Sequence, residues 1–129
     1  MQTFKKEERL SRKKLVDQLF SEGKSLVVFP YRIVWMRGDF ESKYPAQVLI
    51  NVPRKKFKRA VDRNLIKRRT REAYRRNKDL WYKFLDGENF KCVFTLLYIS
   101  TEIASYKDIE EKIILILQRL QSEYEKDIK

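Results

Sequence analysis

The pattern of apolar residues is typical of β-strands in some segments of the chain and of α-helices in others. Residues 25–37 are rich in β-branched and aromatic side chains, which predicts strand, and Pro30 divides this run into a short and a longer strand. A further strand is expected over residues 47–52, antiparallel to the longer one. Residues 90–99 are almost continuously apolar, which predicts a central strand covered on both faces.

Three other segments show helical spacing. Ser11 can cap a first helix that stops at Gly23, and a second helix is expected over residues 59–82. Ser105 and Asp108 have capping-box spacing ahead of a last helix. The apolar stripe of that helix is Ile109, Ile113, Ile116, Leu120 and Tyr124. The expected fold is therefore an α/β (α+β) two-layer sandwich in the order αβββαβα, with helices on a small mixed sheet in one domain over residues 1–129.

Positive charge is concentrated in residues 54–76, RKKFKRAVDRNLIKRRTREAYRR. Of these 23 residues, 12 are Lys or Arg and two are acidic, so the stretch carries +10 of the formal net charge of +12. Four cations recur there at intervals of four residues, which on a helix forms a cationic ridge roughly 18 Å long. The cationic ridge consists of Arg63, Lys67, Arg71 and Arg75. Solvated helices usually mix charge signs at this spacing, so the like charges favour a polyanionic partner.

Composition argues against most enzymatic sites on the chain itself. It has no histidine and one cysteine, Cys92, which we expect to be an inert core residue. An internal disulfide and histidine-based catalysis are thereby excluded, and neither a zinc site nor any other metal-ligating cluster is expected. No apolar run is long enough to span a membrane and the N-terminus lacks a signal-peptide core, so a cytoplasmic location is expected.

Residues 52–75, VPRKKFKRAVDRNLIKRRTREAYR, resemble the signature of the bacterial ribonuclease P protein subunit. That signature combines paired lysines with A-V, R-N-R, I-K-R and R-E. The matching residues are Lys55, Lys56, Ala60, Val61, Arg63, Asn64, Ile66, Lys67, Arg68, Arg71 and Glu72. Arg9, Leu10, Phe20, Gly23 and Ser25 also fall in register with the family. Four positions depart from the pattern: Val16 where phenylalanine is frequent, Lys58 for glycine, Leu65 for the second arginine of R-N-R, and Arg69 where an apolar residue is common.

The resemblance implies a left-handed βαβ crossover, against the usual right-handed rule. It also implies that a catalytic RNA subunit holds Mg²⁺ and removes the 5′ leader of precursor tRNA. The sequence itself shows no evident catalytic residue, metal site or obligate protein partner on this chain, and no membrane association is expected. Contacts to the RNA subunit are then expected from Lys55, Lys56, Arg59, Arg63, Asn64, Lys67, Arg68, Arg71 and Arg75. The single-stranded leader is expected to bind Val16, Phe20, Tyr31 and Arg54. The aromatic rings among them can stack on bases, and Phe29 and Trp35 are further candidates for such stacking.

Two other functions fit the same charge pattern. One is a ribosomal or other structural RNA-binding protein of similar fold with no role in tRNA processing. The other is a DNA-binding protein that reads the major groove with the basic helix, although no helix-turn-helix spacing surrounds it. At Phe20, packing in the core is an alternative to stacking on a base.

Overall fold

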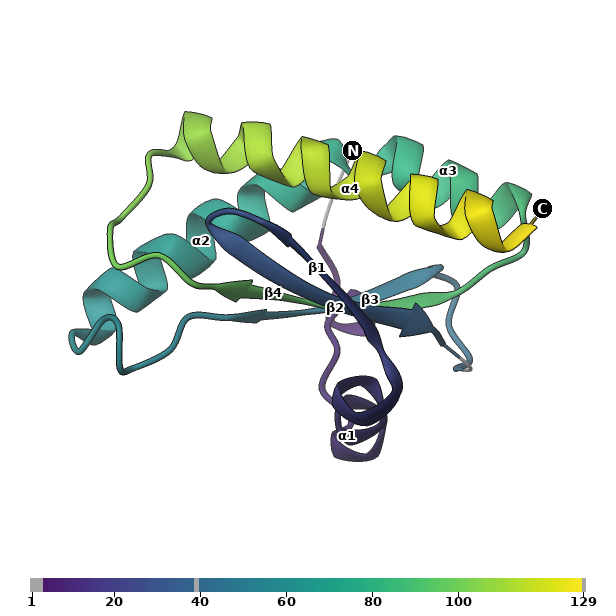
Figure 1. The fold of residues 1–129 in the computed structure, drawn as a ribbon, viewed down its shortest axis with the longest axis horizontal. Coiled ribbons are helices and arrows are strands. Elements are labelled where there is room, and N and C mark those ends of the chain that lie inside the picture. The colour runs from purple at the N-terminus through teal and green to yellow at the C-terminus, as the bar shows by residue number, and fades with distance from the viewer. Residues whose placement is uncertain (1–3, 39, 129) are drawn as a thin grey trace.

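The computed structural model describes residues 4–38 and 40–128. The centre of the fold is a four-stranded sheet with the strand order β1-β2-β4-β3 (Figure 1). The strands are β1 (Lys24–Val28), β2 (Tyr31–Arg37), β3 (Ala46–Asn51) and β4 (Cys92–Tyr98). β2 is antiparallel to both β1 and β4, and β3 is parallel to β4. The predicted antiparallel pairing of β2 with β3 is therefore wrong. β4 lies between them because its almost continuous apolar run can be buried on both faces only at the centre of the sheet.

The helices follow the predicted order, with one division. They are η1 (Lys6–Glu8), α1 (Lys13–Glu22), α2 (Ala60–Asn77), α3 (Asp79–Gly87) and α4 (Tyr106–Ile128). The single basic helix expected over residues 59–82 is divided at Lys78 into α2 and α3. Just before the division, the side-chain amide of Asn77 donates to the carbonyl of Ala73 at 2.8 Å, so it competes for an acceptor of the helix backbone.

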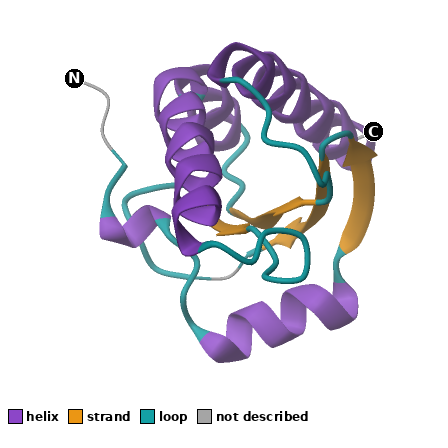
Figure 2. Ribbon diagram, turned by 90° about the vertical axis from the view of Figure 1, so that its left-hand side faces the viewer, coloured by secondary structure: helices purple, strands orange, loops and turns teal. Residues whose placement is uncertain are grey.

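The two faces of the sheet are covered differently. Figures 1 and 2 show α2, α3 and α4 on one face and α1 alone on the other. Tyr31, Ile33 and Trp35 of β2 point into the larger core, together with the predicted stripe of α4, whose five residues are all fully buried. Under α1, the buried Leu19 packs with a smaller group of side chains. That group includes Leu15, Val16, Val34, Met36, Leu49 and Val93. α1 thus adds a partial layer to the expected two.

The N-terminal segment is fixed to the junction of α2 and α3 by a buried ion pair. The ammonium of Lys78 donates to the carboxylate of Glu8, and both side chains are buried. The Tyr82 hydroxyl donates to the same carboxylate at 2.6 Å, and the Lys5 backbone N–H does so at 2.6 Å. This ion pair joins residues 70 positions apart in the chain.

The same segment continues along the outer edge of β3. Arg9 forms a parallel bridge with Val48, and the Leu10 N–H donates to the Val48 carbonyl at 2.9 Å. β3, the two helices α2 and α3, and β4 form a βαβ unit with adjacent parallel strands. The left-handed sense of its crossover stays a prediction.

Candidate nucleic-acid interface

α2 turns its cations away from the sheet. Its inward side buries Ile66, Thr70, Ala73 and Tyr74, whereas Asn64, Arg68 and Arg71 are exposed on the outer side. Arg63, Lys67 and Arg75 are half-buried on the flanks. The cationic ridge is not straight, because each step of four residues advances about 40° beyond a full turn and three steps rotate it by about 120°.

Two apolar residues of α2 and α3 do not pack into the core. Val61 is 58% exposed and Leu80 is 76% exposed. Val61 precedes the buried Ile66 by five residues, which places it about 140° around the helix. Leu80 follows the division at Lys78, where the new helix α3 buries Trp81 and Leu85.

Arg63 holds the basic loop that precedes α2. Its Nη1 donates to the carbonyls of Phe57 and Lys58 at 2.8 and 2.9 Å. The Phe57 ring is itself 7% exposed and lies 5.9 Å from the Tyr98 ring, so the loop is anchored in the core. The loop cations around this anchor are exposed. They are Arg54, Lys55, Lys56, Lys58 and Arg59.

The arginines of α2 have different partners. Arg69 donates to the carbonyl of Ala104 at 2.7 Å, so its charge faces the connection to α4. Arg75 donates to Glu72, and this hydrogen bond lowers the pKa of the Glu72 carboxyl. Partial desolvation, followed by the nearby Arg9 guanidinium, lowers the pKa of Arg71.

A row of side chains on the α1 face of the sheet is left uncovered. α1 packs on Val34, Met36 and Val93. The strand register places the uncovered row next to the residues that α1 covers. We call this uncovered row the sheet platform. It consists of Val27, Arg32, Leu97 and Asn51. Leu97 is half-buried and the other three are exposed. The alternation of side chains along each strand is a signal that could have placed Val27 and Arg32 on this face. The complete row could not be predicted, because that requires the correct strand order.

The residues predicted to bind the leader do not all lie on one surface. Phe20 of α1 is 55% exposed, so packing in the core does not account for it. Val16 is half-buried one turn earlier, and Arg54 is exposed in the loop before α2. Tyr31 and Trp35 belong to the larger core and have almost no exposed surface, so neither ring offers a face to a base.

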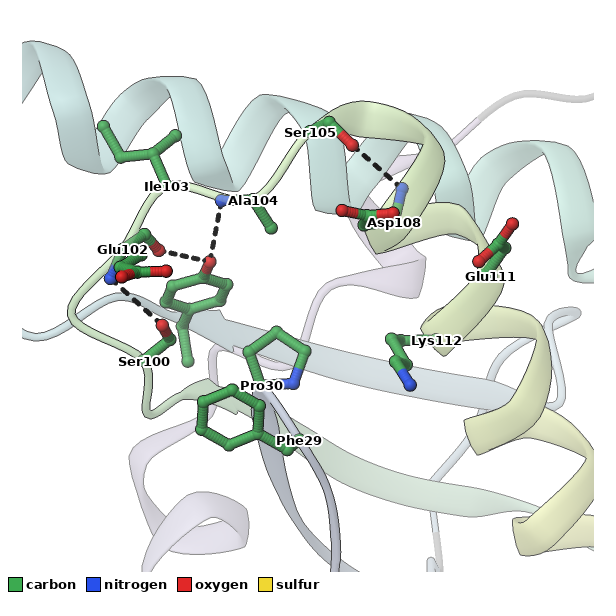
Figure 3. Close-up of a pocket in the computed structure, with 11 residues that line it drawn as sticks. Phe29, Pro30, Ser100, Glu102, Ile103, Ala104, Ser105, Asp108, Glu111 and Lys112 are labelled. Atoms are coloured by element: carbon green, nitrogen blue, oxygen red, sulfur yellow. Dashed lines mark hydrogen bonds between the residues drawn. The ribbon is translucent and has the colours of Figure 1, made fainter.

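A cavity of about 500 Å³ lies between the β1–β2 hairpin tip and the connection from β4 to α4 (Figure 3). Phe29, 62% exposed, stands at its rim, and its charged lining consists of Glu102, Asp108, Glu111 and Lys112. The Ser105 hydroxyl accepts from the Asp108 N–H at 3.2 Å, as the predicted helix cap requires. The excess of carboxylates makes this cavity a poor site for RNA phosphates.

Neither a metal centre nor a membrane span is found in the part of the chain that the structure describes. Over residues 4–38 and 40–128, no three His, Cys, Asp or Glu side chains lie close enough together to hold a metal ion. No helix in these ranges combines the length and apolar character needed to cross a membrane. Cys92 is fully buried, and burial raises the pKa of its thiol to about 12, as expected for an inert core residue.

The sequence and fold have clear relatives. Residues 4–121 match the family model described as Ribonuclease P. This chain belongs to the ribonuclease P protein family. The ribonuclease P protein component of Porphyromonas gingivalis is 35% identical over 81% of this chain and 77% of that protein. The ribonuclease P protein component of Petrotoga mobilis is 32% identical over 94% of this chain and 98% of that protein.

The solved RNase P protein from Thermotoga maritima has the same fold. It superposes with a TM-score of 0.67 at 25% sequence identity, over 87% of this chain and 96% of that one. The predicted mixed α/β fold is therefore confirmed. As a ribonuclease P protein component, the chain is part of a ribonucleoprotein endoribonuclease and acts in RNA binding and tRNA 5′ processing. The comparisons give no support to a ribosomal or other structural RNA-binding role.

Proposed function

We propose that the chain binds two RNAs on opposite faces of its sheet. The cationic ridge, together with Asn64, Arg68 and the basic loop before α2, binds the catalytic RNA subunit. Phe20, Val16, the sheet platform and Arg54 bind the single-stranded 5′ leader of precursor tRNA. The observation that carries this proposal is that α2 and α1 lie on different sides of the sheet, each beside exposed side chains of a different kind.

The outer side of α2 suits a phosphate backbone. Asn64, Arg68 and Arg71 are exposed there, and Arg63 orients the loop that carries Lys55 and Lys56. Lys and Arg side chains that neutralise phosphates release counterions, which favours binding to any RNA of suitable shape. Lys67, Arg75 and Arg59 extend the same basic surface. Leu65, which stands where the family has an arginine, is half-buried, and the next position with an exposed cation is Arg68.

The α1 face suits an unpaired strand. The exposed ring of Phe20 offers a stacking surface, which is worth roughly 1–3 kcal/mol per base. Arg32 lies beside Val27 and Leu97 on the sheet platform, so one cation stands next to apolar surface. Tyr31 is omitted from this surface because its ring is fully buried.

The chain's own residues supply binding rather than bond cleavage. It lacks histidine, and burial raises the pKa of the Tyr31, Tyr74 and Tyr82 hydroxyls far from neutrality, so none of them can exchange a proton readily near pH 7. The described carboxylates do not fit a magnesium site, since no cluster of three forms. We therefore assign the chemistry and its Mg²⁺ to the RNA subunit, in the cytoplasm, with residues 1–129 acting as one RNA-binding domain that needs neither an obligate protein partner nor a membrane.

Cleavage of precursor tRNA tests this proposal. The RNA subunit is assayed with and without the protein over a range of Mg²⁺ concentrations, and the protein is also assayed alone. The protein should lower the Mg²⁺ requirement, because its cations offset phosphate repulsion, and should cleave nothing alone. If about six phosphates are contacted, affinity for the RNA subunit should fall roughly a thousandfold between about 50 and 200 mM salt. Equal cleavage with and without protein at every Mg²⁺ concentration would overturn the proposal.

A further inference from the structure

A second basic surface lies outside α2, where the N-terminal segment meets the start of β3. It is a cavity of about 490 Å³ whose lining includes four cations and two carboxylates. We call it the N-terminal basic pocket. Its cations are Lys6, Arg9, Arg12 and Lys43, and its carboxylates are Glu7 and Glu41. No ion pair joins these carboxylates to these cations within the described residues, so the pocket keeps an uncompensated positive charge.

The first helix separates this pocket from the sheet platform. Gln47 lines the pocket and is the cross-strand partner of Val93, which is in turn the partner of Met36. α1 covers Met36 and Val93. Asn51 of the platform lies four residues further along β3, roughly 13 Å away at the usual rise of a strand. Arg12 directly precedes α1, so the pocket lies at the N-terminal end of that helix. A leader strand on the platform would have to pass α1 to reach the pocket.

Arg9 instead connects the pocket to the basic helix. Its backbone is paired with Val48 at the edge of β3, and its guanidinium lies 5.2 Å from the centre of the Phe4 ring. The Phe4 ring in turn lies 5.8 Å from the ring of Tyr74 in α2, so Arg9 stands beside the basic helix, and its charge contributes to the lowered pKa of Arg71. Two cations held together repel each other, and an anion bound beside both relieves that repulsion. Arg9 therefore stands at the outer edge of β3, between α2 and the pocket that it helps to line.

We propose that the N-terminal basic pocket binds backbone phosphate of the catalytic RNA subunit, so that the RNA turns from α2 around the edge of β3. This proposal rests on the proposed function, because it extends the same RNA-subunit surface. The leader is the less suitable occupant, since α1 lies between the pocket and the platform. Four cations against two carboxylates suit a phosphodiester and not a cationic or neutral ligand.

The first test removes charge from the pocket without touching its backbone pairing. The variant Arg12→Ala/Lys43→Ala changes two exposed side chains, and the matched control Lys83→Ala/Lys107→Ala removes two exposed cations from α3 and α4. Each phosphate that is no longer neutralised should lower the slope of log affinity against log salt by about one, so the pocket variant should bind the RNA subunit roughly tenfold more weakly at moderate salt. The control should bind like the wild type, and both should keep the preference for precursor over leaderless tRNA.

The outcomes separate the two proposals. If the wild-type protein does not bind the RNA subunit at all, the proposed function fails. If it binds, but the pocket and control variants bind equally well, only the pocket proposal is overturned. Loss of leader preference with unchanged affinity for the RNA subunit would also overturn it, because the pocket would then hold the substrate.

A second measurement does not depend on a loss of affinity. Cys92 is fully buried, so Lys43→Cys provides a single accessible thiol to which an iron–EDTA reagent can be attached. In the complex, hydroxyl radicals from this position should cut the backbone of the RNA subunit at a defined segment. The same reagent on Lys107→Cys should leave that segment intact. Cutting of the leader alone, or no cutting of either RNA, would contradict the proposal.

Discussion

The Tyr31 hydroxyl lies 2.6 Å from the Thr70 hydroxyl, so a buried hydrogen bond joins the sheet to the basic helix. The Thr70 hydroxyl donates to the Ile66 carbonyl at 2.8 Å, which leaves Tyr31 as the donor to Thr70. This contact lies directly beneath the outer cations of α2. The ring expected to stack on a leader base thus holds the basic helix α2 on the sheet.

Tyr31→Phe should destabilise the protein without changing leader recognition. The variant loses one buried hydrogen bond, which is worth about 1 kcal/mol, and keeps the aromatic ring in the core. Urea unfolding and the binding of precursor and leaderless tRNA measure the two effects. If the variant lost its preference for precursor over leaderless tRNA at an unchanged free energy of unfolding, Tyr31 would have to contact the leader after all.

Phe20→Ala should have the opposite effect. Phe20 is 55% exposed, so its loss should change the free energy of unfolding by roughly 0.5 kcal/mol or less, as surface substitutions usually do. Loss of one stacking surface should weaken leader binding about 5- to 150-fold, while assembly with the RNA subunit is kept. Leu80→Ala removes another exposed apolar side chain on α3 and serves as control. A large fall in melting temperature for Phe20→Ala would favour a structural role for this ring.

Arg68 and Arg69 are neighbours with different expected roles. Arg68→Ala removes an exposed cation from the outer side of α2, so it should weaken RNA-subunit binding and lower the salt slope by about one at unchanged stability. Arg69→Ala removes the donor to the Ala104 carbonyl and should cost about 1.5–3 kcal/mol of stability. Salt titrations and thermal melts of both variants check this, since each loses one charge. Equal effects on affinity and equal melts would contradict the assignment.

Glu8→Ala should be strongly destabilising. It leaves the Lys78 ammonium in the protein interior without its carboxylate partner, and breaking a buried pair in this way costs about 3–5 kcal/mol. The double variant Glu8→Met/Lys78→Met should recover much of the loss, because no charge remains buried. Urea unfolding of the three proteins measures the difference. A double variant as unstable as Glu8→Ala would show that packing, and not charge, is at fault.

The free protein should lose stability at alkaline pH. Burial raises the pKa of the Tyr31, Tyr74 and Tyr82 hydroxyls above their ordinary value of 10.0, and that of Cys92 from 9.0 to about 12. Above about pH 9 the unfolded chain releases protons that the folded chain keeps, so the free energy of unfolding falls as pH rises. Each group adds a slope of up to about 1.4 kcal/mol per pH unit. Urea unfolding between about pH 7 and 10.5 should show this, and Tyr31→Phe should have a shallower slope. A flat profile would contradict it.

Local spacing was enough to predict most of the secondary structure. The stripe of α4, the division of residues 25–37 at Pro30 and the central position of residues 90–99 all depend on patterns within one segment. The pairing of β3 depends on competition between strands for the centre of the sheet, which no single segment reveals. The division at Lys78 is marked by no Gly or Pro, and the partner of Lys78 at this point, Glu8, lies 70 residues away in the chain.

The site divides in a similar way. Charge density alone predicted the cations of α2 and its loop as an RNA-binding surface, whereas helix rotation, which turns Arg63 inward to hold the loop, is seen only in the structure. The alternation of β2 already placed Tyr31 on the same face as Ile33 and Trp35, so the sequence contained the signal for its burial. The sheet platform needed the strand order, since its four residues come from four strands.

The N-terminal segment also covers part of the β3 edge, where another chain could otherwise add a strand to the sheet. β3 is an edge strand, and edge strands offer unpaired N–H and C=O groups to any other extended chain. Here the Val48 carbonyl is already occupied by Leu10, and the chain then turns away into α1. Part of the β3 edge is thus paired with the chain's own backbone, which leaves fewer unpaired groups there for a second copy to bind.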